Sequence, residues 1–196
     1  RRYIMFILYT VVISIIISYL LGGRFKFILQ QPLKHIWLAT FGLLIQIIIF
    51  TDFFASRCND TISVVLHGVS YILVISFIFI NRKIPGILLI GIGIILNATV
   101  IFLNGGYMPA SLESVEKTSA GRQLEILSQG SATNNSQAIT EDTILPWLAD
   151  IFYIPSWVPL SNVFSIGDVL IAAGVCLYLI RCMKPIDKGM ETVNSK

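Results

Sequence analysis

Five long runs of apolar residues dominate the chain and are separated by mostly short polar or basic connections. The runs cover residues 3–22, 36–56, 62–80, 85–103 and 163–180. Each is close to the ~20 residues that carry a helix across a bilayer, and none alternates as the ~10-residue strands of a membrane β-barrel do. The pattern therefore predicts an all-α, polytopic membrane bundle of about five transmembrane helices in a single domain, 1–196.

The one long segment between runs, residues 104–162, is predicted to form a cap over one face of this bundle. Its middle, 113–142, is poor in bulky apolar residues around 130–140, so we expect a mobile insert there. Its later part is rich in aromatic residues and Pro, which predicts a short interfacial helix at 145–153. Residues 24–35 alternate basic and apolar positions and suit either a second interfacial helix or a plain loop.

Composition and charge support a membrane protein and suggest its orientation. The mean hydropathy is +0.80 and 13% of residues are charged, against about 25% in soluble domains. With five spans, nine of the 14 Lys and Arg residues fall on the side of the C-terminal tail and five on the side of the cap. The positive-inside rule then places the N-terminus and the cap outside the membrane and the C-terminus in the cytoplasm.

Motifs for metal, cofactor or nucleotide chemistry do not occur in the sequence. The three cysteines are widely separated and no Cys/His cluster exists, so we expect neither a disulfide framework nor a metal site. There is no P-loop, HExxH or GxSxG pattern, and no cofactor is expected. The expected partners are the lipid bilayer and either another membrane protein or a second copy of this chain, and not nucleic acid.

Polar side chains inside apolar runs are costly and mark candidate sites. Asp52 and His67 lie equally far from the turn between the second and third runs, so a tight helical hairpin places them at equal depth, roughly 5–10 Å below the boundary. They either form a functional carboxylate–imidazole pair, or Asp52 extends to the outer surface while His67 only cross-links helices. Gly91 and Gly93 should let a neighbouring helix approach closely, and Asn97, a turn beyond Gly93, either bonds that helix or faces the site.

The two ends of the cap carry motifs of their own. Asn104, Gly105 and Gly106 begin an NGGYMP sequence, whose glycines permit the positive φ of a left-handed helix end. This motif is either a helix cap with an aromatic anchor or a lip that contacts a ligand. Ser165 and Asp168 have the S-x-x-D spacing of a helix N-terminus, the alternative being that Asp168 projects into the mouth of the bundle.

These observations define one set of candidate binding residues at the outer end of the bundle. The set is Asp52, His67, Asn97, Asn104, Gly105, Gly106, Met108, Trp147, Asp150, Ser165 and Asp168. No catalytic residue is assigned.

Several of these motifs occur together in a known family. They are LGGR at the end of the first run (Gly22, Gly23, Arg24), NGG-x-MP after the fourth, and S-I-G-D-V-L at the start of the fifth. In this combination the chain resembles a bacterial family described as domain of unknown function 5317. The resemblance implies a polytopic bacterial membrane protein and implies no activity.

Three functions fit the sequence. The first is a binding or accessory subunit that docks another membrane protein or captures a lipid-like or peptide ligand beneath the cap. The second is a small transporter or channel, with Gln46, Asn97, Asp52 and His67 along its path. The third is a membrane enzyme acting on a lipid or quinone, with His67 as general base oriented by Asp52.

Overall fold

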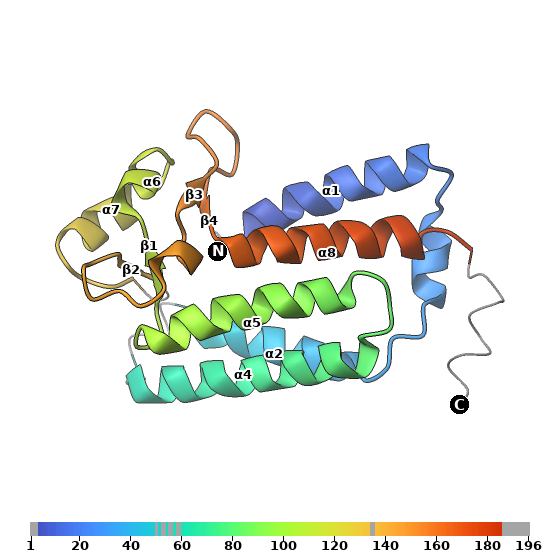
Figure 1. Cartoon of the computed structure of the whole chain (residues 1–196), viewed down its shortest axis with the longest axis horizontal. Coiled ribbons are helices and arrows are strands. Elements are labelled where there is room, and N and C mark those ends of the chain that lie inside the picture. The colour runs from blue at the N-terminus through green and yellow to red at the C-terminus, as the bar shows by residue number, and fades with distance from the viewer. Residues whose placement is uncertain are drawn as a thin grey trace.

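The computed structural model shows a mostly helical protein with its long helices side by side and a cap of short elements at one end (Figure 1). It describes residues 4–49, 51, 54, 57, 60–133 and 136–185. The long helices are α1 (Ile4–Leu20), α2 (Ile36–Ile49), α4 (Asp60–Asn81), α5 (Ile87–Leu103) and α8 (Ile166–Cys182). Each coincides with one of the predicted apolar runs.

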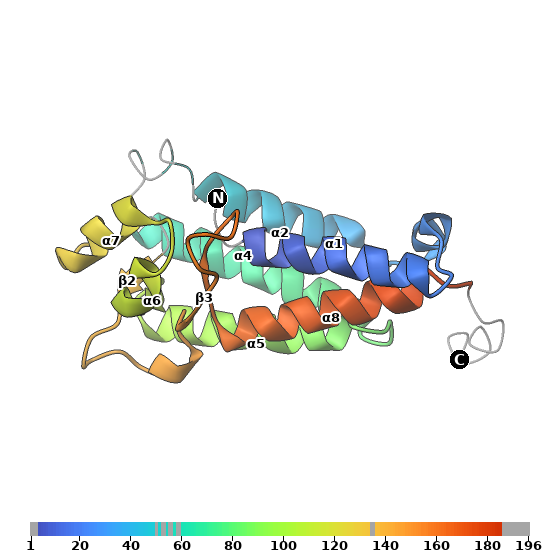
Figure 2. The same cartoon turned by 90° about the horizontal axis from the view of Figure 1, so that it is seen from above.

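The long helices pack as an open arc. Extensive contacts join α2 to α4, α4 to α5, α5 to α8 and α8 to α1. In Figure 1, α1 lies at the upper edge while α2 lies behind α4 and α5, and Figure 2 shows the same helices from above. The helices α1 and α2 are therefore the two ends of the arc.

The closest contact in the arc joins α5 to α8, which run antiparallel. A side chain on Gly93 would meet the backbone carbonyl of Gly167, and one on Gly174 would lie 2.7 Å from the backbone nitrogen of Ile90. A side chain on Gly167 would collide with the carboxamide of Asn97. Small residues let two helix backbones approach in this way, so the close approach predicted for Gly93 is confirmed.

Two asparagines fasten the connecting segments to the ends of helices. Asn81 at the end of α4 accepts from the amide of Lys34 and donates to its carbonyl, both at 2.9 Å. Asn104 after α5 bonds the amide and the carbonyl of Ile144 in the same way, also at 2.9 Å. Each carboxamide thus forms both the donor and the acceptor hydrogen bond with the backbone of one residue in a connecting segment.

At the end of the helices opposite the cap lies η1 (Phe25–Gln30), a 3-10 helix within the predicted 24–35 segment. The amide of Arg24 donates to the carbonyl of Met183 at 2.7 Å, and Gln31 donates to the carbonyl of Cys182 at 3.3 Å. These bonds hold η1 against the end of α8.

The cap consists of β1 (Met108–Ala110), α6 (Leu112–Glu116), α7 (Gly121–Ser128), β2 (Ser136–Ala138), η2 (Pro146–Leu148), β3 (Phe152–Tyr153) and β4 (Val163–Phe164). β1 pairs in parallel with β2, and β3 pairs antiparallel with β4. The cap has a small apolar core around Val115, Leu127 and Val163.

Two predictions for the cap need correction, and one stays open. The helix predicted at 145–153 is only the single turn of η2, followed by β3. The fifth apolar run begins with β4, and its helix starts at Ile166. The insert 113–142 contains most of α6 together with α7 and β2, and its mobility stays a prediction.

The prediction of five membrane-crossing helices is not supported by helix length. Among the described residues, only the stretch Thr61–Asn81 of α4 is both long and apolar enough to cross a membrane. α1, α5 and α8 have 17 residues each and the described α2 has 14. α1 ends at Leu20 before a turn, α5 begins at Ile87 after a turn, and β4 takes up the first residues of the fifth run, so these three helices are shorter than their apolar runs.

The α5–α8 approach predicts the effect of a small substitution. Gly167→Ala should destabilise the protein by roughly 1–3 kcal/mol, because the new methyl group must displace Asn97 and separate the helices. Gly121→Ala is the matched control, since nothing lies within 4 Å of a side chain there. Thermal unfolding of both purified variants tests this, and equal melting temperatures would contradict it.

Candidate functional site

A cavity of about 390 Å³ lies between α2, α4, α5 and α8, directly beneath the cap. The cap itself contributes two lining residues, Met108 from β1 and Asp150 from the segment after η2. Asp150 is held there by its backbone, which donates to the carbonyl of Pro109 at 2.9 Å and accepts from the amide of Ser111 at 3.1 Å. The cavity is therefore closed at one end by strand-like pairing within the cap.

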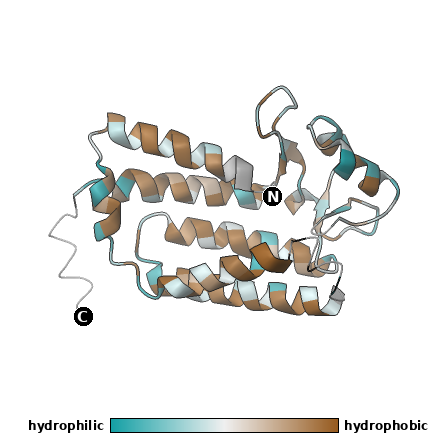
Figure 3. Cartoon of the chain, turned by 180° about the vertical axis from the view of Figure 1, so that it is seen from behind, coloured by the Kyte–Doolittle hydropathy of each residue, from teal (hydrophilic) through white to brown (hydrophobic). Residues whose placement is uncertain are grey.

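The cavity is polar at its cap end and apolar at its other end. The polar lining residues are Gln46, His67, Tyr71, Asn97, Asp150 and Asp168. On each helix they lie toward the cap, while the lining residues farther from it are apolar, as with Val74, Ile78, Ile87 and Ile90. The hydropathy colouring in Figure 3 shows mostly hydrophobic long helices and, at their right-hand end, a cap that contains many hydrophilic residues.

Asp168 is the centre of a hydrogen-bond network between α5 and α8. Its Oδ1 accepts from the Asn97 carboxamide at 2.9 Å, and its Oδ2 accepts from the Ser165 amide at 2.9 Å and hydroxyl at 3.0 Å. Ser165 Oγ also lies 2.9 Å from Asn97 Oδ1 and accepts from the Asp168 amide at 3.1 Å. This is a complete capping box, so the N-terminal cap that the S-x-x-D spacing predicted is confirmed.

The wall opposite this network is formed by α4 and α2. The ring of His67 is buried and lies 4.9 Å from the ring of Tyr71, which in turn lies 5.8 Å from that of Phe102. Gln46 donates to the hydroxyl of Ser70 at 3.2 Å, and that hydroxyl donates to the carbonyl of His67 at 2.6 Å. An imidazole, a phenol and a carboxamide thus face the site from this side.

The structure gathers five of the predicted residues around one cavity. His67, Asn97, Met108, Asp150 and Asp168 all line it. Ser165 supports the site through Asp168 and Asn97, without being among the lining residues. Asp52 lies outside the described residues, so its pairing with His67 stays a prediction.

The other predicted residues belong to the cap or to its attachment to α5. Asn104 fastens the cap to α5 through Ile144, and Gly105 and Gly106 adopt positive φ angles of 74° and 95°, as the NGG motif predicted. Trp147 is 56% exposed and is not among the residues that line the cavity. These residues shape the cap and do not line the cavity.

Sequence reasoning missed Tyr71 as a lining residue. It lies four positions after His67 on α4, so the two side chains share a helix face. That spacing could have indicated a lining role for Tyr71, but a tyrosine in an apolar run is equally consistent with a role in helix packing.

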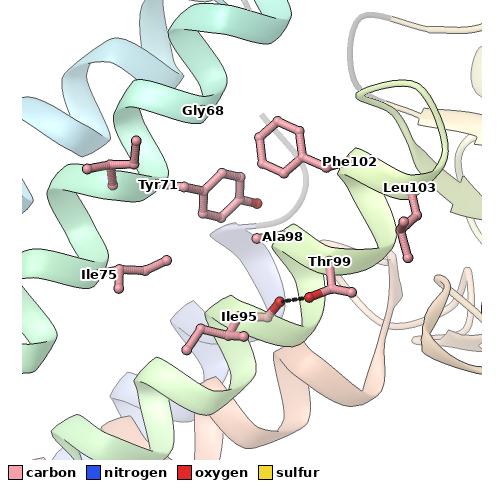
Figure 4. A pocket seen from close by; sticks show the side chains of 9 residues that line it. Gly68, Tyr71, Ile75, Ile95, Ala98, Thr99, Phe102 and Leu103 are labelled. Atoms are coloured by element: carbon pink, nitrogen blue, oxygen red, sulfur yellow. Dashed lines mark hydrogen bonds between the residues drawn. The ribbon is translucent and has the colours of Figure 1, made fainter.

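A second hollow, of about 450 Å³, lies on the outer face of α4 and α5 (Figure 4). Its lining is almost entirely apolar, with Gly68 and Ala98 as small residues and Ile75 and Leu103 as larger ones. The hydroxyl of Thr99 is used within α5, where it donates to the carbonyl of Ile95 at 2.8 Å. Because no carboxylate or imidazole lines this hollow, the cavity beneath the cap is the better candidate site.

Among the described residues, no group of three His, Cys, Asp or Glu side chains is arranged to hold a metal ion. The polar groups that line the cavity are two carboxylates, an imidazole, a phenol and two carboxamides.

Comparison with known proteins identifies the family. The model of the family of unknown function DUF5317 matches residues 30–180. The chain is a member of DUF5317. The matched region contains α2, α4, α5, the cap and most of α8, and thus all the residues that line the cavity.

The chain is also similar to an uncharacterised protein of Thermotoga maritima, with 28% identity over 175 residues, covering 88% of each protein. No solved structure matches the chain. The comparisons therefore confirm the expected DUF5317 resemblance and assign no activity.

The pairing of Asn104 with Ile144 predicts how firmly the cap is attached. Asn104→Ala removes two hydrogen bonds to the cap, so the Ile144 amide should exchange with solvent roughly tenfold faster. The exposed Gln129→Ala variant, elsewhere in the cap, is the control. Hydrogen exchange measured over peptides spanning 136–148 tests this, and unchanged exchange would show that Asn104 does not hold the cap.

Proposed function

We propose that the chain is a membrane-embedded binding protein that holds a lipid-like molecule in the cavity beneath the cap. The observation that carries the proposal is the lining of that cavity, which is polar where the cap closes it and hydrocarbon elsewhere. Binding pockets combine apolar walls with a few convergent polar groups in this way. No nucleophile needs to be invoked, because the proposed role is to bind.

The outward faces of the helices support a membrane environment. Only 22% of the apolar stretch in α4 is buried inside the protein, so most of its side chains face outward. Large apolar side chains such as Ile72, Phe79 and Leu88 are more than half exposed. In water such a surface would drive aggregation, whereas in a bilayer it meets hydrocarbon.

Helix length is compatible with this proposal at its lower limit. Membrane-spanning helices have ~17–25 residues, and α1, α5 and α8 have 17 each. The distribution of Lys and Arg supports an orientation with the cap outside and the C-terminus in the cytoplasm. The exposed Trp147 and Trp157 in the cap suit a membrane–water interface.

Membrane topology tests the first part of the proposal. In a variant in which Ser replaces the native cysteines, Glu141→Cys in the cap should react with a membrane-impermeant maleimide on intact cells. Lys184→Cys after α8 is the matched position at the other end and should react only after the membrane is permeabilised. Recovery of the protein in the soluble fraction, or the reverse labelling pattern, would contradict the proposal.

Filling the cavity tests the second part. Ile94 lines the cavity, whereas Ile92 on the same helix is exposed on the outer face. Ile94→Trp should lower the amount of small amphiphile that co-purifies with the protein by at least about tenfold, because the indole occupies its space. Ile92→Trp should leave that amount unchanged.

The amount is measured by mass spectrometry of an organic extract of each purified variant. Equal amounts from the wild type and from both variants would contradict binding in the cavity.

A further inference from the structure

The shape of the cavity restricts what it can hold. Its lining residues on α5 extend from Ile87 to Ile101, which corresponds to about 21 Å of helix at 1.5 Å per residue. A volume of about 390 Å³ spread over that length is a narrow, elongated space. It suits one extended hydrocarbon chain better than a compact ring system or a lipid with two chains.

The polar end of the cavity has a net acidic character. Asp150 and Asp168 both line it and both are buried, and no Lys or Arg is among its lining residues in the described part of the chain. An anionic head group placed here would face two carboxylates, whose repulsion and desolvation would oppose binding. A cationic head group would be attracted to the same carboxylates.

Asp168 is also prepared to accept a hydrogen bond from a ligand. The three bonds from Asn97 and Ser165 fix the orientation of its carboxylate. An ionised carboxylate can accept about four hydrogen bonds, so an acceptor position remains for a donor on the ligand. A charge-assisted bond from an ammonium group is stronger than one from a neutral donor.

One side wall of the cavity lies at the protein surface. Leu43 of α2 lines it and is nevertheless 54% exposed, so at α2 the wall of the cavity is a side chain that is itself at the protein surface. This helix is one end of the open arc and packs mainly on α4, through Gly42 and Val74. In the proposed membrane setting this wall faces hydrocarbon, which suits entry of a molecule with an alkyl chain.

We propose that the cavity binds a single-chain amphiphile whose positively charged, hydrogen-bond-donating head lies against Asp168 and Asp150. Its alkyl chain then extends along α4 and α5 toward Ile87. The proposal rests on the binding function proposed above and adds the class of ligand.

The test compares amphiphiles with the same chain and different heads. Purified full-length protein in a non-ionic detergent is incubated with dodecylamine, dodecyltrimethylammonium, dodecanol or dodecanoate, and retained ligand is measured by native mass spectrometry. Dodecylamine should bind at least about tenfold more tightly than dodecanol or dodecanoate. It should also bind more tightly than dodecyltrimethylammonium, which carries the charge but cannot donate a hydrogen bond.

Variants then assign the preference to the two carboxylates. Asp168→Asn and Asp150→Asn should each reduce the preference for dodecylamine by about tenfold, whereas Asp142→Asn, an exposed acid in the cap, should leave it unchanged. The melting temperature of each variant is measured without ligand. If Asp168→Asn does not fold because its capping box is weakened, the result for Asp150→Asn decides whether the preference for dodecylamine depends on the carboxylates.

The outcomes separate the two proposals. Three results would overturn the proposed ligand class but not the proposal that the cavity binds an amphiphile. They are equal binding of all four amphiphiles by the wild type, preference of the wild type for dodecanoate, and a preference for dodecylamine that persists in both carboxylate variants. Failure of the wild type to bind any of the four would overturn the proposed binding function as well.

Discussion

The close approach of α5 to α8 is the constraint on which the rest of the structure depends. Because Gly93 and Gly167 have no side chains, the two backbones come near enough for Asn97 to reach Ser165 and Asp168. The resulting network satisfies a buried carboxylate with neutral donors and caps α8 at the same time. A larger residue at either glycine would separate the helices and leave these buried polar groups without their hydrogen-bond partners.

This contact also sets the polarity of the proposed site. α5 and α8 meet the cap at the end where Asn97 and Asp168 lie, while the opposite end of the cavity is lined by residues such as Ile87 and Val74. Asn104, one turn after Val100 on α5, ties the cap to the same helix through Ile144. One helix therefore positions both the polar end of the cavity and the segment that covers it.

The sequence predicted the features that depend on local chemistry. The apolar runs located the long helices, the S-x-x-D spacing located the capping box, and the paired glycines located the sharp turn after α5. It did not predict the pairing of Met108–Ala110 with Ser136–Ala138, because a strand pair between distant segments leaves no periodic signal in such short stretches. It also overestimated helix length, since hydropathy cannot distinguish the first turn of a helix from an apolar strand such as β4.

The central claim is that the cavity beneath the cap holds an elongated amphiphile, and an experimental structure of the protein isolated from its source cells without added amphiphile tests this most directly. We predict elongated non-protein density between α2, α4, α5 and α8, with its polar end against Asp168 and its other end toward Ile87. A structure in which side chains fill this space, or in which Asp168 and Asn97 are separated and face away from it, would contradict the account.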